Sequence, residues 1–160
     1  MKNKLQVWDL DSTLIDTSHR YRNLPGTNKI DLQYWRDMAT PENIKKDKII
    51  RPTINLYKNA INCRETLVVI CTARVMSQAD FNFVNHYLPG YDHLFSREEG
   101  DNSPDWKLKV KNLSPFAGFA SKDIFDDNKS VLTSIGKLGF TTWLSVFNSG
   151  MLGRIERFFV

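Results

Sequence analysis

Short apolar runs and longer amphipathic segments alternate along the chain. Four of the apolar runs are rich in β-branched residues and too short for helices, which predicts buried strands at residues 5–8, 66–71, 123–125 and 140–146. Hydrophobic positions at helical spacing predict helices at residues 31–39, 52–61, 75–88, 104–113 and 129–138, with Gly139 as a C-terminal cap. This alternation predicts an α/β fold whose mainly parallel sheet is covered by helices on both faces.

One segment interrupts this rhythm. Residues 14–51 are richer in polar and turn residues, with Pro25, Gly26 and Pro41 as turn signals. Tyr34 and Trp35 lie in a helical phase that favours packing, so we expect a small helical cap inserted after the first strand, at about residues 15–50. A long surface loop is the alternative. Because 160 residues is the length of one ordinary domain, we expect a single domain over residues 1–160 that carries this insertion.

The composition narrows the class of protein. No apolar run approaches the ~20 residues that a membrane span needs, and the first apolar run is too short for a secretory signal. Cys63 and Cys71 have neither CxxC spacing nor paired histidines, which indicates reduced thiols and a cytoplasmic location, that of the host if a phage encodes the chain. The net charge of +4 suits an anionic substrate or nucleic acid, but a solvated basic face explains it equally well.

Two carboxylates one residue apart follow the first predicted strand, in the stretch QVWDLDSTLID. Crowded acids raise each other's pKa, and burial raises it further, so a cation or some chemistry is expected there. Ligands of open α/β sheets bind at the carboxyl ends of the strands. The polar residues expected to gather at that edge are Asp9, Asp11, Thr13, Thr72, Arg74, Lys109, Asp126 and Asp127.

Clustered aspartates with a hydroxyl and a lysine have the composition of a metal and phosphate site. Hard oxygen ligands in an incomplete protein shell suit Mg²⁺, and the expected ligands are Asp9, Asp11, Asp126 and Asp127. A calcium EF-hand loop also begins D-x-D, but here Leu14 stands where that loop needs glycine and Arg20 where it needs glutamate. The calcium-loop alternative is therefore discarded.

The order of these residues also predicts their chemistry. Asp9 is the expected nucleophile, which would form an aspartyl-phosphate. Asp11, two residues on, would give a proton to the leaving alcohol and later take one from water. Thr72 and Lys109 would bind the phosphoryl oxygens where charge accumulates.

These residues resemble the four motifs of the haloacid-dehalogenase-like (HAD-like) phosphohydrolases, in the forms DLDST, ICTAR, Lys109 and FDD. The resemblance covers most of the chain and implies a Rossmann-like sheet, Mg²⁺ and hydrolysis of phosphomonoesters. Of the two later acids, it favours Asp127 as the direct metal ligand and Asp126 as a partner that acts through a water or another ligand, but members of the family differ in this order. Two positions depart from the usual motifs, since Ser12 replaces a glycine and Thr-Ala replaces Ser-Gly at residues 72–73.

Within this superfamily, residues 95–109 (FSREEGDNSPDWKLK) look like the segment ahead of the lysine in the 3′-phosphatase domain of phage polynucleotide kinase and its stand-alone relatives. This closer resemblance selects Lys109 over its neighbouring lysines. It further implies substrate-binding roles for Arg97 and Asp105, and for Arg20 and Arg74. No GxxxxGK[ST] pattern occurs, so the kinase part of that repair enzyme is not expected.

The sequence thus predicts a Mg²⁺-dependent phosphomonoester hydrolase that acts through an aspartyl-phosphate, on nucleotides or on 3′-phosphate ends of nucleic acid. A 5′-nucleotidase or a small-metabolite phosphatase is the alternative among enzymes. The alternative of another class is a non-catalytic nucleic-acid-binding module, for which we would expect a lost nucleophile or a lost metal acid. The sequence leaves the oligomeric state open and predicts no membrane partner.

Overall fold

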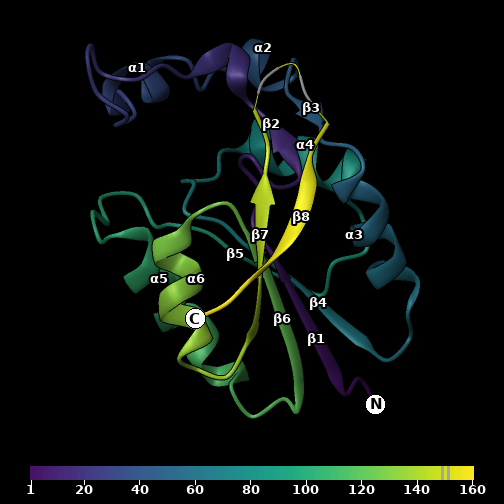
Figure 1. Ribbon diagram of the computed structural model, residues 1–160. Helices are drawn as coiled ribbons and strands as arrows, with labels where there is room; N and C mark the ends of the chain where they lie inside the picture. The colour runs from purple at the N-terminus through teal and green to yellow at the C-terminus, as the bar shows by residue number, and fades with distance from the viewer. Residues whose placement is uncertain (149, 151) are drawn as a thin grey trace.

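A six-stranded sheet forms the centre of the molecule in the computed structural model, which describes residues 1–160 except 149 and 151 (Figure 1). Its strands lie in the order β5-β4-β1-β6-β7-β8, and neighbouring strands are parallel except for the antiparallel pair of β7 and β8. The strands of this sheet are β1 (Lys4–Trp8), β4 (Thr66–Cys71), β5 (His93–Phe95), β6 (Ser121–Asp126), β7 (Thr141–Val146) and β8 (Arg154–Phe158). The prediction of an α/β fold with a mainly parallel sheet is confirmed.

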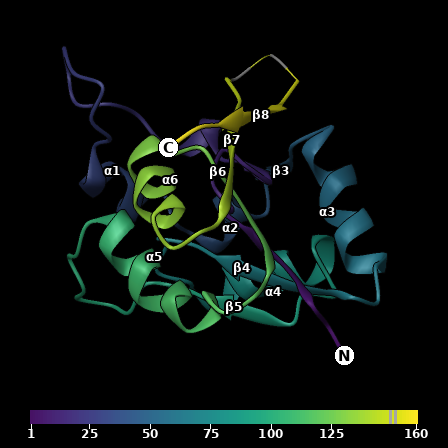
Figure 2. The same cartoon turned by 60° about the horizontal axis from the view of Figure 1, so that its bottom comes forward.

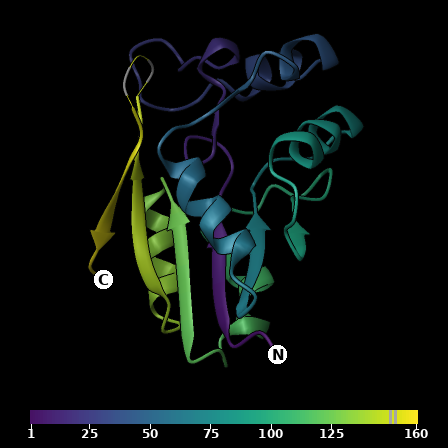
Figure 3. The ribbon, with the colours of Figure 1, turned by 90° about the vertical axis from the view of Figure 1, so that its right-hand side faces the viewer.

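Helices cover both faces of the sheet. The larger ones are α3 (Thr53–Asn62), α4 (Gln78–Tyr87), α5 (Asp105–Leu113) and α6 (Lys129–Gly136), and the 3₁₀ helix η2 (Ser114–Phe116) follows α5. Figures 2 and 3 show α3 and α6 on opposite sides of the sheet. Alternate residues of β1 therefore enter two apolar clusters, with Trp8 packed among residues of α3 and α4, and Leu5 and Val7 packed among residues of α5 and α6.

Stacked aromatic rings tie the central strands together. The ring of Trp8 lies 3.9 Å from that of Phe125, nearly parallel to it, and meets the ring of Tyr57 edge-on at 5.9 Å. The hydroxyl of Tyr57 donates to the carbonyl of Leu88 over 2.9 Å, so α3 is joined to the end of α4. This packing fixes β1 and β6, whose carboxyl ends carry the predicted acidic residues.

We call residues 14–51 the cap segment. It contains the short strands β2 (Ile15–Asp16) and β3 (Lys48–Ile49), the 3₁₀ helix η1 (Ser18–Arg20), and the short helices α1 (Leu32–Asp37) and α2 (Pro41–Ile44). β2 and β3 pair antiparallel, so the two ends of the segment meet. Figures 1 and 3 show the segment beyond the carboxyl ends of β1, β6 and β7. The predicted helical content is present there.

Several boundaries differ from those expected. The helix predicted from residue 75 begins only at Gln78, because Ser77 and Asp80 form a reciprocal capping box at its N-terminus. β5 was not predicted since its three residues are too few for a periodic signal, and β8 was not predicted since charged residues alternate in it without an apolar run. Among the described residues, no helix combines the length and the apolar character that crossing a bilayer requires.

Candidate active site

The loop after β1 is tightly folded and held from several sides. The amide N–H groups of Leu14 and Ile15 both donate to the carbonyl of Leu10 over 2.9 Å, which closes the turn. Ser12 has a φ of 63°, a left-handed conformation that favours glycine, and this is the position where the resemblance expected one. The hydroxyl of Ser145, in β7, donates to the carbonyl of Ser12 over 2.9 Å. The loop is therefore fixed by the far end of the chain as well as by its own turn.

A buried lysine connects two of the predicted acids. Lys109 of α5 donates from Nζ to Asp9 over 2.8 Å and to Asp126 over 2.7 Å. All three side chains are buried, and Asp126 also accepts from the amide N–H of Asn128 over 2.9 Å. The two aspartates raise the pKa of Lys109 well above its ordinary value, although burial alone would lower it. The lysine therefore stays cationic between two carboxylates.

A third carboxylate completes this group. Asp9, Asp126 and Asp127 offer one carboxylate oxygen each, and these oxygens lie within 4.8 Å of one another. Burial, together with the charge of Asp126, raises the pKa of Asp9 to about 7. Desolvation and the carboxylates of Asp9 and Asp126 likewise hold the pKa of Asp127 well above its usual range. When all three acids are ionised, one lysine leaves two negative charges to be balanced, and burial together with this imbalance raises the pKa values of Asp9 and Asp127.

The donor set fits a hard divalent cation. Its ligand atoms are all carboxylate oxygens, which Mg²⁺ prefers, and a charge of +2 matches the imbalance left by Lys109. Asp9 and Asp126 are buried, whereas Asp127 is exposed as a whole residue although its carboxylate is desolvated, so waters or phosphate oxygens could reach the group and complete a coordination shell. Asp11 does not belong to this group of carboxylates, and its predicted metal role stays a prediction.

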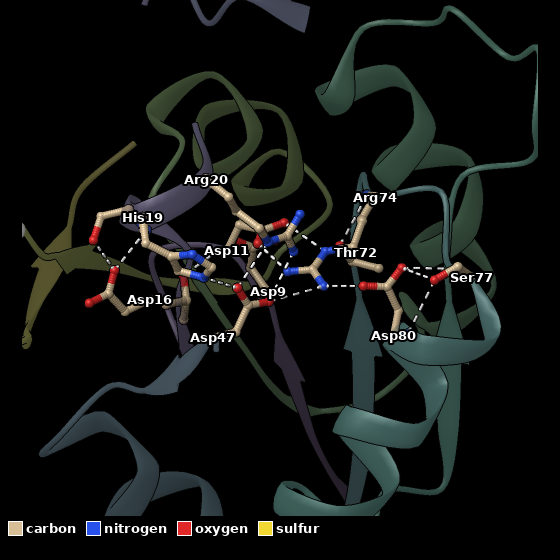
Figure 4. A network of polar contacts seen from close by, with 12 residues as sticks. Asp9, Asp11, Asp16, His19, Arg20, Asp47, Thr72, Arg74, Ser77 and Asp80 are labelled. Atoms are coloured by element: carbon tan, nitrogen blue, oxygen red, sulfur yellow. Dashed lines mark hydrogen bonds and ion pairs between the residues drawn. The ribbon is translucent and has the colours of Figure 1, made fainter. Parts of the chain in front are cut away.

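Asp11 is instead paired with Arg74. The Nε of Arg74 donates to one carboxylate oxygen of Asp11 over 3.3 Å, and Nη2 donates to the other. The same guanidinium donates from Nη1 to Asp80 over 2.6 Å and lies 4.0 Å from Asp47. Burial alone would lower the pKa of Arg74, but these carboxylates, Asp11 first among them, raise it above its usual value. Figure 4 shows Arg74 between Asp11 and Asp80.

Arg20 lies in a second buried ion pair, inside the cap segment. Its Nε and Nη2 donate to the two carboxylate oxygens of Asp47, each over 2.9 Å, and both side chains are inaccessible to solvent. His19 Nε2 lies 2.8 Å from Asp47, and the guanidinium carbon of Arg20 lies 4.3 Å from the ring centroid of Trp35. The guanidinium carbon of Arg74 lies 5.8 Å from the centroid of the same ring. The guanidinium groups of Arg20 and Arg74 thus both lie close to the ring of Trp35, in the cap segment.

The remaining predicted residues, Thr72, Arg97 and Asp105, lie beside the ion pairs of these arginines. Thr72 is buried at the end of β4, where its hydroxyl oxygen accepts from the amide N–H of Arg74 over 3.1 Å. Arg97 donates to the carbonyls of Ala73, Asp101 and Ser103, and to the carboxylate of Asp105 over 2.8 Å. These contacts join the loop after β4 to the segment before α5. Substrate-binding roles for Arg97 and Asp105 stay predictions.

Comparisons with known proteins identify the family of the chain. Residues 1–98 match the family described as bacteriophage T5 5′-deoxynucleotidase. The chain belongs to this family. It is 28% identical over 164 aligned positions to the 5′-deoxynucleotidase of Escherichia phage T5, and the match covers 88% of the chain but 66% of that relative, slightly under two thirds of its length.

Solved structures show the same fold at lower identity. A HAD-like family hydrolase from Streptococcus pneumoniae has a TM-score of 0.63 at 12% identity, over 87% of this chain and 82% of that one. A chain of the Pnkp1/Rnl/Hen1 RNA repair complex has a TM-score of 0.60 at 20% identity, over 89% of this chain and 42% of that one. These likenesses show that the chain has the fold of HAD-like hydrolases, which is the fold that its motifs predicted.

The family match also divides the site. Asp9, Asp11, Arg20 and Arg74 lie within residues 1–98, whereas Lys109, Asp126 and Asp127 lie beyond them. The structure nevertheless brings Asp9, Lys109 and both later aspartates together. The structure therefore brings residues inside and outside the matched region into one group of side chains.

Sequence reasoning missed several members of the polar network. Asp80 could have been found, because the stretch SQAD has the spacing of a capping box before a helix, S-x-x-[DE]. Asp47 carries no such signal, since it stands between lysines in KKDK and reads as part of a solvated surface. Its burial follows from the pairing of β2 with β3, which sequence periodicity does not reveal.

Proposed function

We propose that the protein is a Mg²⁺-dependent 5′-nucleotidase that hydrolyses deoxynucleoside 5′-monophosphates through a phosphorylated Asp9. The observation that carries this proposal is the group of Asp9, Asp126, Asp127 and Lys109 at the carboxyl ends of β1 and β6. The name of the phage T5 relative supports a 5′-deoxynucleotide as the substrate. The wider set of phosphomonoesters expected from the sequence is thereby narrowed.

The residues of the chain divide the chemistry between them. A carboxylate oxygen of Asp9 attacks phosphorus, while the bond from phosphorus to the 5′-oxygen breaks and Asp11 gives that oxygen a proton. Asp11 then takes a proton from the water that attacks phosphorus, and inorganic phosphate leaves Asp9. Lys109 stands next to Asp9, within reach of the phosphoryl oxygens on which charge accumulates. Thr72 and Arg74 at the end of β4 are proposed to bind the phosphoryl group from the other side.

A divalent cation would be held by Asp9, Asp126 and Asp127. When bound, it would neutralise the two charges that Lys109 leaves unbalanced and polarise the phosphoryl group. Because Asp126 is already bound to Lys109 and to the amide N–H of Asn128, we propose Asp127 as the more direct ligand. This is the order that the family resemblance implied.

We further propose that residues 1–160 form one phosphatase domain whose cap segment, at about residues 15–50, covers the site. Trp35 and the guanidinium groups of Arg20 and Arg74 lie close together where the cap segment faces the first loop. An aromatic ring and two cations are suited to a nucleoside and its phosphate. Arg20 is therefore kept as a proposed substrate-binding residue, although in the structure its hydrogen bonds go to Asp47.

A second candidate substrate is the 3′-phosphate end of a polynucleotide. The stretch from Arg97 to Lys109 supports it, because this stretch carries the resemblance to the 3′-phosphatases, and Arg97 donates to Asp105 within it. The likeness to the chain from the RNA repair complex concerns the fold alone. This candidate differs from the first in that longer substrates should bind more tightly at low salt.

One assay compares these candidates. Purified protein is given deoxynucleoside and ribonucleoside 5′-monophosphates, nucleoside 3′-monophosphates, and oligonucleotides that end in 3′-phosphate, with Mg²⁺ or with a chelator. We expect release of phosphate from the 5′-deoxynucleotides with Mg²⁺ alone, and its loss in Asp9→Asn. Glu65→Gln, at an exposed position away from the site, is the matched control. Preference for the oligonucleotide that falls steeply with salt would favour the second candidate, and inactivity on every compound would favour a non-catalytic binding module.

A further inference from the structure

A buried aspartate outside the phosphatase motifs makes two sets of contacts. Asp80 lies in the first turn of α4 and is 2% exposed. One of its carboxylate oxygens accepts from the amide N–H of Ser77 over 2.8 Å and from the Ser77 hydroxyl over 2.9 Å. The other oxygen accepts from Nη1 of Arg74 over 2.6 Å. The carboxylate is therefore held by the start of α4 and in turn holds an arginine.

Arg74 in turn restrains Asp11 in the loop after β1. Its Nε and Nη2 donate to the two carboxylate oxygens of Asp11, on the side of the guanidinium away from Asp80 (Figure 4). A guanidinium is planar, and its donors have fixed relative directions. When Nη1 is bound to Asp80, the directions of Nε and Nη2 are therefore fixed as well. The carboxylate of Asp11 is held by a group whose own orientation is set by α4.

Asp11 needs such a restraint more than Asp9 does. Asp9 is buried and held by Lys109 and Thr13, whereas the side chain of Asp11 is 32% exposed. A partly exposed carboxylate in a loop can rotate between staggered positions unless its partners hold it. General acid catalysis requires that the donating oxygen lie within hydrogen-bond reach of the leaving oxygen.

We propose that Asp80 is a positioning residue, which acts through Arg74 to hold Asp11 where it protonates the leaving 5′-oxygen. The inference rests on the proposed function, because it concerns the same reaction. In that step the bond from Asp9 to phosphorus forms, the bond from phosphorus to the 5′-oxygen breaks, and a proton carried by Asp11 goes to that oxygen, which leaves Asp11 as the carboxylate that Arg74 binds in the structure. Asp80 itself touches neither the substrate nor the reacting atoms.

Two substrates with different leaving groups distinguish positioning from general support of the fold. The 5′-alkoxide of a nucleoside is a poor leaving group that needs a proton, whereas p-nitrophenolate is a stable anion that leaves without one. The constant kcat/KM reports the steps up to departure of the alcohol, so hydrolysis of the phosphorylated enzyme does not enter it. The ratio of kcat/KM for the nucleotide to kcat/KM for p-nitrophenyl phosphate therefore measures how well the proton is delivered.

The experiment measures this ratio in the wild type, in Asp80→Asn and in Ser77→Ala. Asparagine has one carbonyl oxygen, so it cannot serve both Arg74 and Ser77. Ser77→Ala is the matched control, because it removes the hydroxyl that caps α4 but leaves the Asp80 carboxylate for Arg74. We expect Asp80→Asn to lower the ratio by about 10- to 100-fold, as small displacements of catalytic groups do, and Ser77→Ala to leave it within about twofold. Thermal unfolding of each protein shows whether it is folded at the assay temperature.

Equal losses on both substrates in Asp80→Asn would overturn the proposal, and so would an equal change of the ratio in Ser77→Ala. If Asp80→Asn does not fold, Asp80→Glu takes its place, since it keeps the charge but moves it by one methylene group. We then expect a smaller fall of the ratio, and an unchanged ratio would overturn the proposal. A wild type that hydrolyses neither substrate would instead refute the proposed function.

Discussion

Replacing Asp9 by asparagine should abolish turnover and yet stabilise the metal-free protein at neutral pH. The pKa of Asp9 is about 7 in the folded protein and 3.8 in its ordinary state, because the side chain is buried beside Asp126. Between these pH values the folded state keeps a proton that the unfolded state has lost. The free energy of unfolding must therefore fall as the pH rises through this window.

The size of this effect follows from the shift. At about 1.4 kcal/mol for each pH unit, the ionisation of Asp9 costs the fold about 4 kcal/mol by pH 7. Asparagine carries no charge, and its one carbonyl oxygen can still accept from Lys109, although the hydrogen bond from Thr13 to the other carboxylate oxygen is lost. Lys109 does lose one of its two charged partners, so we expect a net gain of about 1–3 kcal/mol at pH 7.

Urea unfolding followed by tryptophan fluorescence measures the difference. In the presence of a chelator, we expect the advantage of Asp9→Asn to grow from about pH 4 to about pH 7, since in this window unfolding of the wild type releases the proton of Asp9. Millimolar Mg²⁺ should stabilise the wild type more than the variant, because the variant offers the cation one carboxylate fewer. An advantage that shrinks as the pH rises, or a variant less stable than the wild type at pH 7 without metal, would refute this reasoning.

Three further predictions concern neighbouring positions. Lys109→Met should lower the free energy of unfolding at neutral pH by about 3–5 kcal/mol, because two buried acids lose the cation that they share. A decrease of less than about 1 kcal/mol, measured by urea unfolding, would contradict this. Asp47→Asn should lower the free energy of unfolding by about 3 kcal/mol, because the buried guanidinium of Arg20 loses its carboxylate partner. Faster proteolysis within the cap segment would reveal this loss. Unchanged proteolysis would count against a role of Asp47 in holding that segment. Ser12→Gly should raise the free energy of unfolding by about 1 kcal/mol, because it relieves a positive φ, and a lowered melting temperature would show that the serine is not strained.

Much of the site could be predicted because the residues that matter follow strands. Asp9 and Asp126 each stand at the carboxyl end of a short apolar run, and parallel strands bring such ends to one edge of a sheet. Lys109 was harder to choose among neighbouring lysines, and the family resemblance selected it. The structure places this lysine between the two acids. Strand order follows from connectivity and burial, and this is why the acidic positions could be found without coordinates.

The partners of the arginines could not be predicted in the same way. Arg20 and Arg74 were expected to meet substrate, yet in the structure both guanidinium groups are bound by buried carboxylates, with Asp47 as the partner of Arg20. Asp47 is brought there by the return of the cap segment through β3, a contact between residues 27 positions apart. Which charged side chains meet across such a loop depends on its three-dimensional path, and neither periodicity nor local spacing encodes that path.

The hydrogen bond from Ser145 to the carbonyl of Ser12 joins residues 133 positions apart, and Lys109 reaches Asp9 across 100. During translation, the acidic loop after β1 therefore leaves the ribosome long before Lys109 and Ser145 have been synthesised. The contacts around Asp9 are therefore incomplete until residue 145 has been synthesised, so a stop codon between residues 109 and 145 should be as harmful as one before residue 9. Asp9 is among the first residues synthesised, but the side chains that hold it and its loop in place come 100 or more positions later.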